Sequence, residues 1–324
     1  MGRHRGTRAP RIAIVVPCFN EGETLVQTIP ILKGKLGDLI AASRCDQNSI
    51  IVFVDDGSTD CTWDLVKAAS CKASGSIVGI RLAINAGHQN ALMAALDFVA
   101  DRVEASISID ADLQDSLASL EDMLAAYQDG AEIVFGVRRS READTVFKRI
   151  TAAFFYRFMR LMGVDAIEQH ADYRLLSRAA MRNLRQFPEY HLFLRGLATR
   201  LHNRVAVVEY ERLPRTAGHT KYSLRKMLSL ALRGITSFST YPLRAISVVG
   251  FIVFSIGLLL ATYAVISSFA GATVPGWASI SAPLYALGGI IMLSIGILGE
   301  YVGKIYEQVK ARPRYLVDEI AGDE

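Results

Sequence analysis

The sequence is poor in the residues and motifs that mark several common classes of protein. Its 324 residues include only four cysteines, and none has a CxxC or histidine-paired spacing, so we expect free thiols and no zinc centre. The formal net charge is only +4, and basic residues interleaved with aromatic ones are missing, so nucleic-acid binding is not favoured. No GxGxxG follows the first apolar run, which disfavours a dinucleotide-dependent oxidoreductase.

Charge is missing altogether from one long stretch. From Ala245 to Gly299 there is no Asp, Glu, Lys or Arg, and about 20 apolar residues suffice to cross a bilayer as a helix. We therefore predict a membrane hairpin over 244–303, with helices at about 245–268 and 280–302. Lys and Arg flank the outer ends of the hairpin and are absent from its turn, so both termini are expected in the cytoplasm. The predicted location is the inner (plasma) membrane; the alternative, a hairpin buried in a protein core, is disfavoured by the unbroken lack of charge.

Before this stretch, apolar runs alternate with amphipathic segments. Short runs rich in β-branched residues begin near Arg11, Ile50, Ile77, Ser106 and Ile133, and helical patterns separate them. This alternation predicts an α/β fold with a mostly parallel, doubly wound sheet. We assign the basic tail to 1–10, the α/β domain to 11–222 and a cytoplasmic C-terminal tail to 304–324.

The segment 223–243 joins the α/β domain to the predicted hairpin. Leu224, Leu228 and Ile235 recur on one side of a helix, while Arg225 and Arg233 make it basic. Such a helix either lies in the membrane interface or packs on the globular domain, and the sequence leaves both alternatives open.

Polar residues follow three of the predicted strands where each strand ends, in the segments Pro17–Glu21, Asp55–Asp60 and Asp110–Asp115. The carboxyl ends of parallel strands form the ligand-binding edge of an open α/β sheet. Asp110 and Asp112, together with the amide oxygen of Gln114, are hard oxygen ligands that suit Mg²⁺ or Mn²⁺. A metal there would neutralise a diphosphate, which points to a nucleotide-activated donor. For an Asp-x-Asp pair alone, the alternative is a solvated turn or a helix cap.

Several motifs together resemble family 2 glycosyltransferases with the GT-A (Rossmann-like) fold. They are Val-Val-Pro-Cys-Phe-Asn-Glu from Val15, Val-Asp-Asp-Gly-Ser-Thr-Asp from Val54, Asp-Ala-Asp-Leu-Gln-Asp from Asp110 and Phe-Gly-Val-Arg from Phe135. The stretches from Arg215 to Tyr222 and from Gly299 to Tyr306 are similar to the polyprenyl-phosphate branch, which contains dolichol-phosphate mannose synthase and the bactoprenol glucosyl transferases.

The resemblance implies a role for individual residues. Donor-binding residues would be Pro17, Phe19, Glu21, Val54, Asp56, Asp110, Ala111, Asp112 and Arg138. The metal would be held by Asp112 and Gln114 beside Asp110, and the acceptor phosphate by Arg215 and Lys221. Asp172 would act at the reacting centre with those two cations, the alternative being a structural pairing with Arg174. His88 receives no role.

The resemblance also implies a reaction. It predicts a membrane-anchored, inverting transfer of one sugar, favouring UDP-glucose as donor, to a polyprenyl phosphate such as undecaprenyl phosphate on the cytoplasmic leaflet. The Gln-x-x-Arg-Trp signature of processive synthases is missing, since tryptophan occurs only as Trp63 and Trp277. The alternatives are a GDP-mannose-dependent mannosyltransferase and, in another class, an inactive partner that recruits a lipid flippase. A homo-oligomer and a separate flippase downstream are further expectations.

Overall fold

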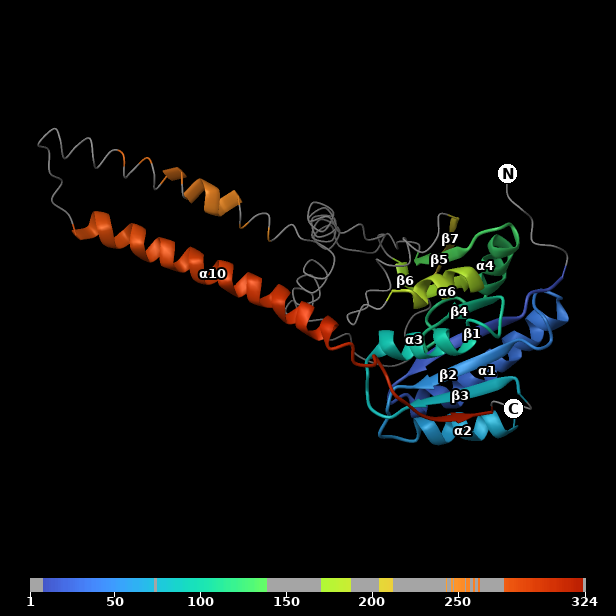
Figure 1. Cartoon of the computed structure of the whole chain (residues 1–324). Coiled ribbons are helices and arrows are strands. Elements are labelled where there is room, and N and C mark those ends of the chain that lie inside the picture. The colour runs from blue at the N-terminus through green and yellow to red at the C-terminus, as the bar shows by residue number, and fades with distance from the viewer. Residues whose placement is uncertain are drawn as a thin grey trace, which may run out of the picture. The chain divides into compact units, whose positions relative to one another are not determined.

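The computed structural model describes residues 8–72, 75–138, 170–187, 204–211 and 277–322, with isolated residues between 243 and 262 (Figure 1). The chain divides into two compact units. The first contains Met1–Thr151, Ala166–Thr220 and Arg312–Glu324, and the second contains Ala152–Asp165 and Lys221–Ala311.

The first unit is built on one eight-stranded sheet. Its strands lie in the order β7-β5-β6-β4-β1-β2-β3-β8. Their bounds are β1 Ile12–Cys18, β2 Ile50–Asp55, β3 Ile77–Leu82, β4 Ala105–Ser108, β5 Ile133–Arg138, β6 His170–Ser177, β7 Val205–Tyr210 and β8 Val317–Ala321. Only β6 and β8 run against the other strands, because their pairings are antiparallel. The predicted α/β class with a mostly parallel sheet is confirmed.

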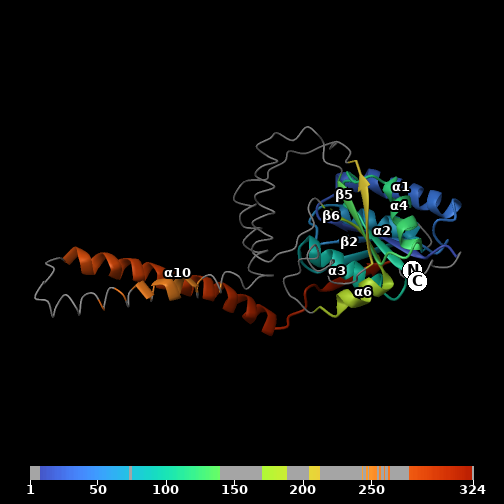
Figure 2. The ribbon, with the colours of Figure 1, turned by 90° about the horizontal axis from the view of Figure 1, so that it is seen from above.

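Helices cover both faces of the sheet, which is why its central strands are buried. Every residue of β1 and β2 is buried, as expected for parallel strands packed on two sides. The helices are α1 Gly22–Ala41, α2 Thr62–Lys72, α3 His88–Val99, α4 Ser119–Gln128 and α6 Arg178–Arg185. Figure 2 shows α1 and α4 on one side of the sheet and α3 and α6 on the other. The single buried core therefore fixes the strand ends where the polar loops emerge.

The C-terminal segment contributes a strand to this sheet, within the stretch 304–324 for which we predicted a cytoplasmic tail. β8 pairs with the edge strand β3 (Figure 1), and Glu319 accepts hydrogen bonds from Trp63 Nε1 at 3.2 Å and Lys67 Nζ at 2.6 Å. Tyr315 donates to Asp97 at 2.7 Å. The strand is short and mostly exposed, with one fully buried residue, Ala321, so it lacks the alternating apolar pattern that predicts a strand from sequence.

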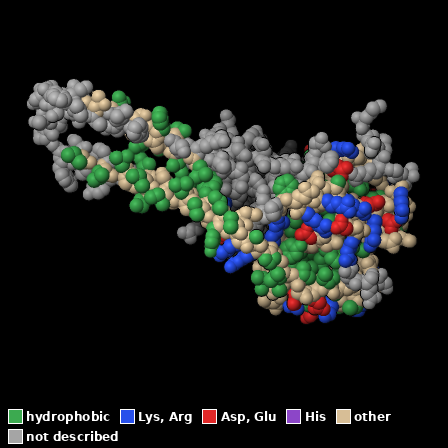
Figure 3. All heavy atoms as spheres, in the orientation of Figure 1, with side chains coloured by type: hydrophobic (Ala, Val, Ile, Leu, Met, Phe, Trp, Pro, Cys, Tyr) green, Lys and Arg blue, Asp and Glu red, His purple; other side chains and the backbone are tan. Residues whose placement is uncertain are grey.

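The second unit contains one long described helix, α10, which runs from Trp277 to Val309. Large apolar side chains are exposed along it, among them Ile280, Leu287, Ile295 and Val302, and Figure 3 shows apolar side chains along its visible face. Among the helices that the structure describes, none meets the combined requirement of length and apolar character for crossing a membrane. The predicted helix at 245–268 is described only in part, and most of the segment 223–243 lies outside the described residues. The membrane hairpin therefore stays a prediction.

Candidate active site

The polar loops predicted from the sequence emerge at one edge of the sheet. Because β1, β2, β3 and β4 are parallel neighbours, the loops that follow them share the carboxyl edge. β6 is antiparallel to β4, so the amino end of β6 lies at this edge as well. Ligands of open α/β sheets bind at this edge.

The loops after β1 and β2 hold each other in place. Asn20 N–H donates to Ser58 Oγ at 2.9 Å, Thr59 N–H donates to Asn20 Oδ1 at 2.9 Å, and Gly22 N–H donates to Asp60 Oδ2 at 3.0 Å. Asn20 takes a left-handed conformation with φ of 53°, which asparagine tolerates better than most residues. In this arrangement the side chain of Phe19, directly after β1, is exposed.

The predicted donor residues of these two strands divide into buried and accessible ones. Pro17 and Val54 are register partners in β1 and β2, and both are buried. Glu21 is half-buried, and its Oε2 accepts a hydrogen bond from Thr24 at 2.8 Å. Of these four residues, Phe19 and Glu21 have side chains that a ligand could reach, and Pro17 and Val54 form the wall behind them.

Asp56 connects the end of β2 to the loop that precedes α3. Its two carboxylate oxygens accept hydrogen bonds from the N–H groups of Ala86 at 2.7 Å and Gly87 at 3.0 Å. Burial raises the pKa of Asp56, with these two hydrogen bonds acting in the opposite direction. Gly57 follows with φ of +68°, and a Cβ there would lie 2.7 Å from Asn85 N. A side chain is thus excluded at the point where the two loops touch.

The turn after β4 carries the proposed metal ligands. Ala111 is buried and its carbonyl accepts a hydrogen bond from Thr28 Oγ1 at 2.7 Å, while Asp112 is exposed. Leu113 is held at φ of +46°, a strained conformation for a branched residue. Gln114 N–H donates to Asp112 Oδ1 at 3.3 Å.

Two tyrosines, one from β6 and one from β7, brace this turn. Tyr210 donates to the buried Asp115 at 2.5 Å, and Tyr173 donates to the carbonyl of Ser116 at 3.0 Å. The two rings lie edge to face with centroids 5.2 Å apart. Burial raises the pKa of Tyr173 far above its ordinary value, so its hydroxyl stays a donor at neutral pH.

Asp172 lies close to this turn, although it is remote in sequence. Ser108 of β4 pairs with Arg174 of β6 in antiparallel register. Asp110, two residues beyond Ser108, and Asp172, two residues before Arg174, therefore lie at the same edge of the sheet. Arg174 Nη2 donates to Asp172 Oδ1 at 2.6 Å. The predicted alternative for Asp172, a pairing with Arg174, is therefore present in the structure.

His88 joins these carboxylates, which the sequence did not indicate. Its Nε2 lies 3.4 Å from Asp172 Oδ2 and 3.9 Å from Asp110 Oδ1. Burial lowers the pKa of His88, but the hydrogen bond to Asp172 and the charges of Asp110 and Asp172 outweigh it, so the pKa is raised overall. The only sequence signal for His88 was its place after the Asn-Ala-Gly turn that follows β3.

Asp110 has the most perturbed carboxyl group of the edge. Its partial burial and the charges of Asp115, Asp172 and Asp112 raise its pKa to about 6, against the attraction of His88. A carboxyl group of this kind, next to other acidic groups, is typical of a functional site.

In the turn after β4, Gln114 offers an oxygen of the kind that binds a divalent metal. Gln114 is buried, and among the described residues its Oε1 has no hydrogen-bond partner. This amide oxygen and the carboxylates of Asp110 and Asp112, which lie in the same turn, form a set of hard ligands that would suit Mg²⁺ or Mn²⁺ once substrate oxygens complete it. Within the described part of the chain, no group of three or more His, Cys, Asp or Glu side chains is arranged to hold a metal ion.

The structure does not describe the side chains of the remaining predicted site residues. Arg215 and Lys221 lie outside the described residues, and of Arg138 only its place as the last residue of β5 is described. β5 runs parallel to β7 and antiparallel to β6, so Arg138 ends at the same edge as Asp110.

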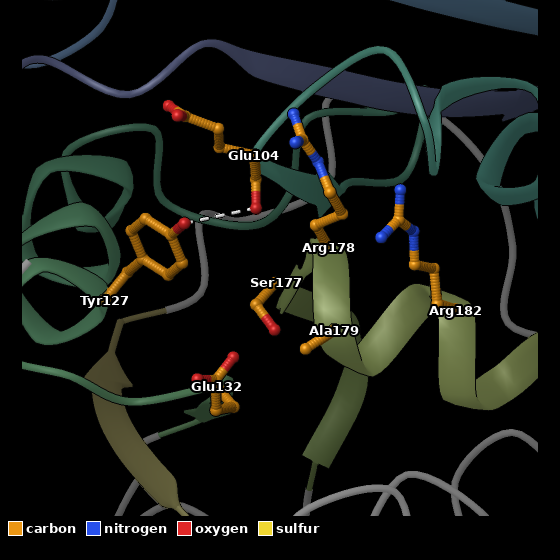
Figure 4. Close-up of a pocket in the computed structure, with 7 residues that line it drawn as sticks. All are labelled: Glu104, Tyr127, Glu132, Ser177, Arg178, Ala179 and Arg182. Carbon is orange, nitrogen blue, oxygen red and sulfur yellow. Dashed lines mark hydrogen bonds between the residues drawn. The ribbon is translucent and has the colours of Figure 1, made fainter.

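A cavity of about 300 Å³ lies elsewhere in this unit. It is lined by Glu104, Tyr127, Glu132, Ser177, Arg178, Ala179 and Arg182, as Figure 4 shows. Glu104 and Glu132 precede β4 and β5, and Ser177 ends the antiparallel β6. The cavity therefore lies at the opposite edge of the sheet from the acidic residues and is separate from the candidate site.

The mostly parallel sheet and the polar loops at its carboxyl edge define an α/β protein of the class whose ligands bind at the carboxyl ends of the strands. The family model for glycosyl transferase family 2 matches residues 13–185, and the chain belongs to that family and is a glycosyltransferase.

Individual relatives extend the similarity beyond the matched domain. The chain is 45% identical over 309 residues to the uncharacterized glycosyltransferase YkoT of Bacillus subtilis (strain 168), covering 95% of this chain and 91% of the relative. It is 37% identical over 309 residues to the bactoprenol glucosyl transferase of Shigella phage SfX, covering 95% and 98%. Among solved structures, a mannosyltransferase from Pyrobaculum calidifontis in complex with GDP-Man and Mn²⁺ matches with a TM-score of 0.48 and 18% identity, over 94% of this chain and 86% of that one.

Proposed function

We propose that the protein transfers one sugar from a nucleotide sugar, with UDP-glucose favoured, to a polyprenyl phosphate such as undecaprenyl phosphate. The observation that carries this proposal is the 37% identity to a bactoprenol glucosyl transferase over 95% of this chain and 98% of that relative. The residues at the carboxyl edge are consistent with it, since they combine carboxylates for a metal with a surface that a base and a ribose could cover.

Asp110, Asp112 and Gln114 are the residues that would hold Mg²⁺ or Mn²⁺. When bound, the ion would neutralise the diphosphate and so favour its departure. Phe19 and Glu21 would contact the base and ribose, and Asp56 would shape the wall behind them through the loop it anchors. The braced turn keeps the carboxylates in place before substrate arrives, which is the preorganisation that electrostatic catalysis requires.

The chemical step is a single displacement. A phosphate oxygen of the acceptor attacks the anomeric carbon, the new bond forms on one face, and the bond to the nucleoside diphosphate breaks on the other, which inverts the configuration. The acceptor oxygen is already anionic at neutral pH, so a strong general base is not needed. Asp172 would therefore act mainly by orientation, and Arg215 and Lys221 would bind the acceptor phosphate and reduce its repulsion by the donor.

Membrane anchoring is part of the proposal, because a polyprenyl chain stays in the bilayer. The uncharged stretch Ala245–Gly299 and the exposed apolar side chains of α10 support it. β1 and β8 lie in one sheet although the uncharged stretch separates them in the chain. If the chain crosses the membrane, it must therefore cross an even number of times, in keeping with a hairpin and cytoplasmic termini at the inner membrane. The homo-oligomer and the downstream flippase stay predictions.

A donor panel tests the proposal. Purified protein in detergent or vesicles is given Mn²⁺, undecaprenyl phosphate and labelled UDP-glucose, GDP-mannose or other nucleotide sugars in turn. Glycolipid formed from UDP-glucose supports the favoured donor, and glycolipid formed only from GDP-mannose would replace it by the mannosyltransferase alternative. Binding of lipid phosphate with no binding of any nucleotide sugar would instead favour the inactive, flippase-recruiting partner.

A further inference from the structure

The carboxylate of Asp172 is held from two sides by residues of different elements. Arg174, which is 2% exposed, donates to Oδ1 at 2.6 Å, and His88 Nε2 lies 3.4 Å from Oδ2. Contacts to both carboxylate oxygens fix the direction of the Asp172 side chain. Arg174 comes from the same strand as Asp172, and His88 comes from the start of α3.

The position of His88 is fixed in turn by Asp56, the residue that directly follows β2. Asp56 accepts hydrogen bonds from Ala86 N–H and Gly87 N–H, directly before His88. The side chain of Asn90 closes the first turn of α3 by donating to the carbonyl of Ala86 at 2.8 Å. A continuous set of contacts thus leads from Asp56 through the start of α3 to Asp172.

His88 also separates two like charges. Its Nε2 is 3.9 Å from Asp110 Oδ1 as well as 3.4 Å from Asp172 Oδ2, so one donor group faces both carboxylates. Without it, the repulsion between the carboxylates of Asp110 and Asp172 would favour other rotamers of Asp172, against the contact with Arg174.

We propose that His88 is a positioning residue that acts through Asp172, fixing the Oδ2 atom while Arg174 fixes Oδ1, so that the carboxylate is directed at the reacting sugar. This assignment rests on the proposed function, in which Asp172 lies at the reacting centre. The competing possibility is direct contact of His88 with the donor or acceptor, because the side chain of His88 is 43% exposed and that of Asp172 only 14%.

A double-mutant cycle distinguishes the two roles. We would measure kcat and KM for UDP-glucose in wild type, His88→Ala, Asp172→Ala and the double variant. Residues that act as a unit are non-additive, so His88→Ala should lower kcat about tenfold or more with little change in KM, and the double variant should be no slower than Asp172→Ala alone. The proposal would be overturned if the losses in kcat of the two single variants multiplied in the double variant, or if His88→Ala kept a normal kcat.

Two further variants control for folding. His88→Gln places an amide donor near the position of Nε2 and should recover most of the kcat lost in His88→Ala. Gln89→Ala changes the next residue of the same helical turn, whose side chain points elsewhere, and should keep normal kcat. A His88→Gln variant as slow as His88→Ala, with an unchanged melting temperature, would contradict a donor role.

The same cycle on donor hydrolysis separates this proposal from the proposed function. In that reaction water replaces the lipid phosphate, and labelled UDP-glucose alone is the probe. If all four proteins form no glycolipid but the cycle remains non-additive for hydrolysis, the acceptor assignment fails and the His88–Asp172 unit stands. If lipid transfer proceeds in wild type and the cycle is additive in both reactions, the proposed function stands and the positioning role fails.

Discussion

Asp110, a proposed metal ligand, carries an unfavourable charge when it is ionised. Its pKa is raised to about 6 by burial and by neighbouring carboxylates, so the fold favours the protonated form relative to the unfolded chain. Its ionisation therefore destabilises the metal-free protein above about pH 6, and this cost vanishes well below the ordinary aspartate pKa of about 3.9, where the group is protonated in both states.

We therefore expect Asp110→Asn to melt at a higher temperature than wild type in EDTA at about pH 7.5. The difference should shrink as the pH falls through about 6 and disappear below about pH 4. Thermal unfolding followed by circular dichroism across this range measures it. A variant that is less stable than wild type at neutral pH would show that Asp110 contributes a favourable interaction that its raised pKa does not reveal.

Gln114 offers a second test at the level of one residue. Its buried Oε1 has no hydrogen-bond partner among the described residues, and an unpaired buried carbonyl is costly. Gln114→Met keeps the volume and removes the oxygen. We expect Mn²⁺ binding in the presence of UDP to weaken by about tenfold or more, with stability unchanged or raised.

Calorimetric titration with Mn²⁺ and thermal unfolding give the two readouts. Gln128→Met, at the end of α4, is the matched control and should keep wild-type affinity. Equal Mn²⁺ affinity in Gln114→Met and wild type would remove Gln114 from the metal site.

At the scale of elements, the loop after β2 depends on one glycine. Gly57 has φ of +68°, and a Cβ would lie 2.7 Å from Asn85 N, within the loop that Asp56 anchors. Gly57→Ala should destabilise the protein by about 1–3 kcal/mol and weaken nucleotide binding.

Gly34→Ala is the matched control for Gly57→Ala. Gly34 lies inside α1, and nothing stands within 4 Å of an added Cβ. It should raise the free energy of unfolding by about 0.5–1 kcal/mol. Chemical denaturation measures both variants, and a Gly57→Ala variant as stable as wild type would mean that the loop can take another conformation.

The strand β8 makes a testable contribution of its own. Its residue Glu319 accepts hydrogen bonds from both Trp63 and Lys67, and the hydrogen bond from Lys67 is the main cause of its lowered pKa. Glu319→Ala should lower the melting temperature at neutral pH more than Asp318→Ala does, and the effect should fade at acidic pH, where the carboxyl is protonated. Equal effects of the two variants would show that β8 is held by its backbone pairing alone.

The same elements show what could be predicted from the sequence. The strands β1, β2 and β5 and the turn from Asp110 to Gln114 were predictable, because apolar runs and acidic strand ends are local patterns. The pairing of Arg174 with Asp172 was foreseen as an alternative, because the two residues are close in sequence. The approach of His88 to Asp172 was not, since it depends on the antiparallel register of β6 with β4, which brings Asp172 to the carboxyl edge of the sheet. β8 was missed because it is short and mostly exposed, and its pairing with the distant strand β3 leaves no local pattern.

At the scale of the whole molecule, the chain leaves the sheet after β7 and returns to it in β8. With the uncharged stretch between them, we predict that the protein sediments with membranes and resists extraction at alkaline pH. Tags at the two ends should both be accessible from the cytoplasmic side only. Release of the protein by alkaline carbonate, or tags on opposite sides, would contradict the hairpin.

The central claim is that the acidic edge binds a nucleotide sugar through a divalent ion and passes the sugar to a lipid phosphate. The most direct test is the formation of labelled glycolipid from UDP-glucose and undecaprenyl phosphate by the purified protein, with Mn²⁺ and with EDTA, in wild type and Asp112→Ala. We predict glycolipid from wild type with Mn²⁺ and nearly none in EDTA or from Asp112→Ala. Undiminished glycolipid in EDTA and from Asp112→Ala would contradict this account.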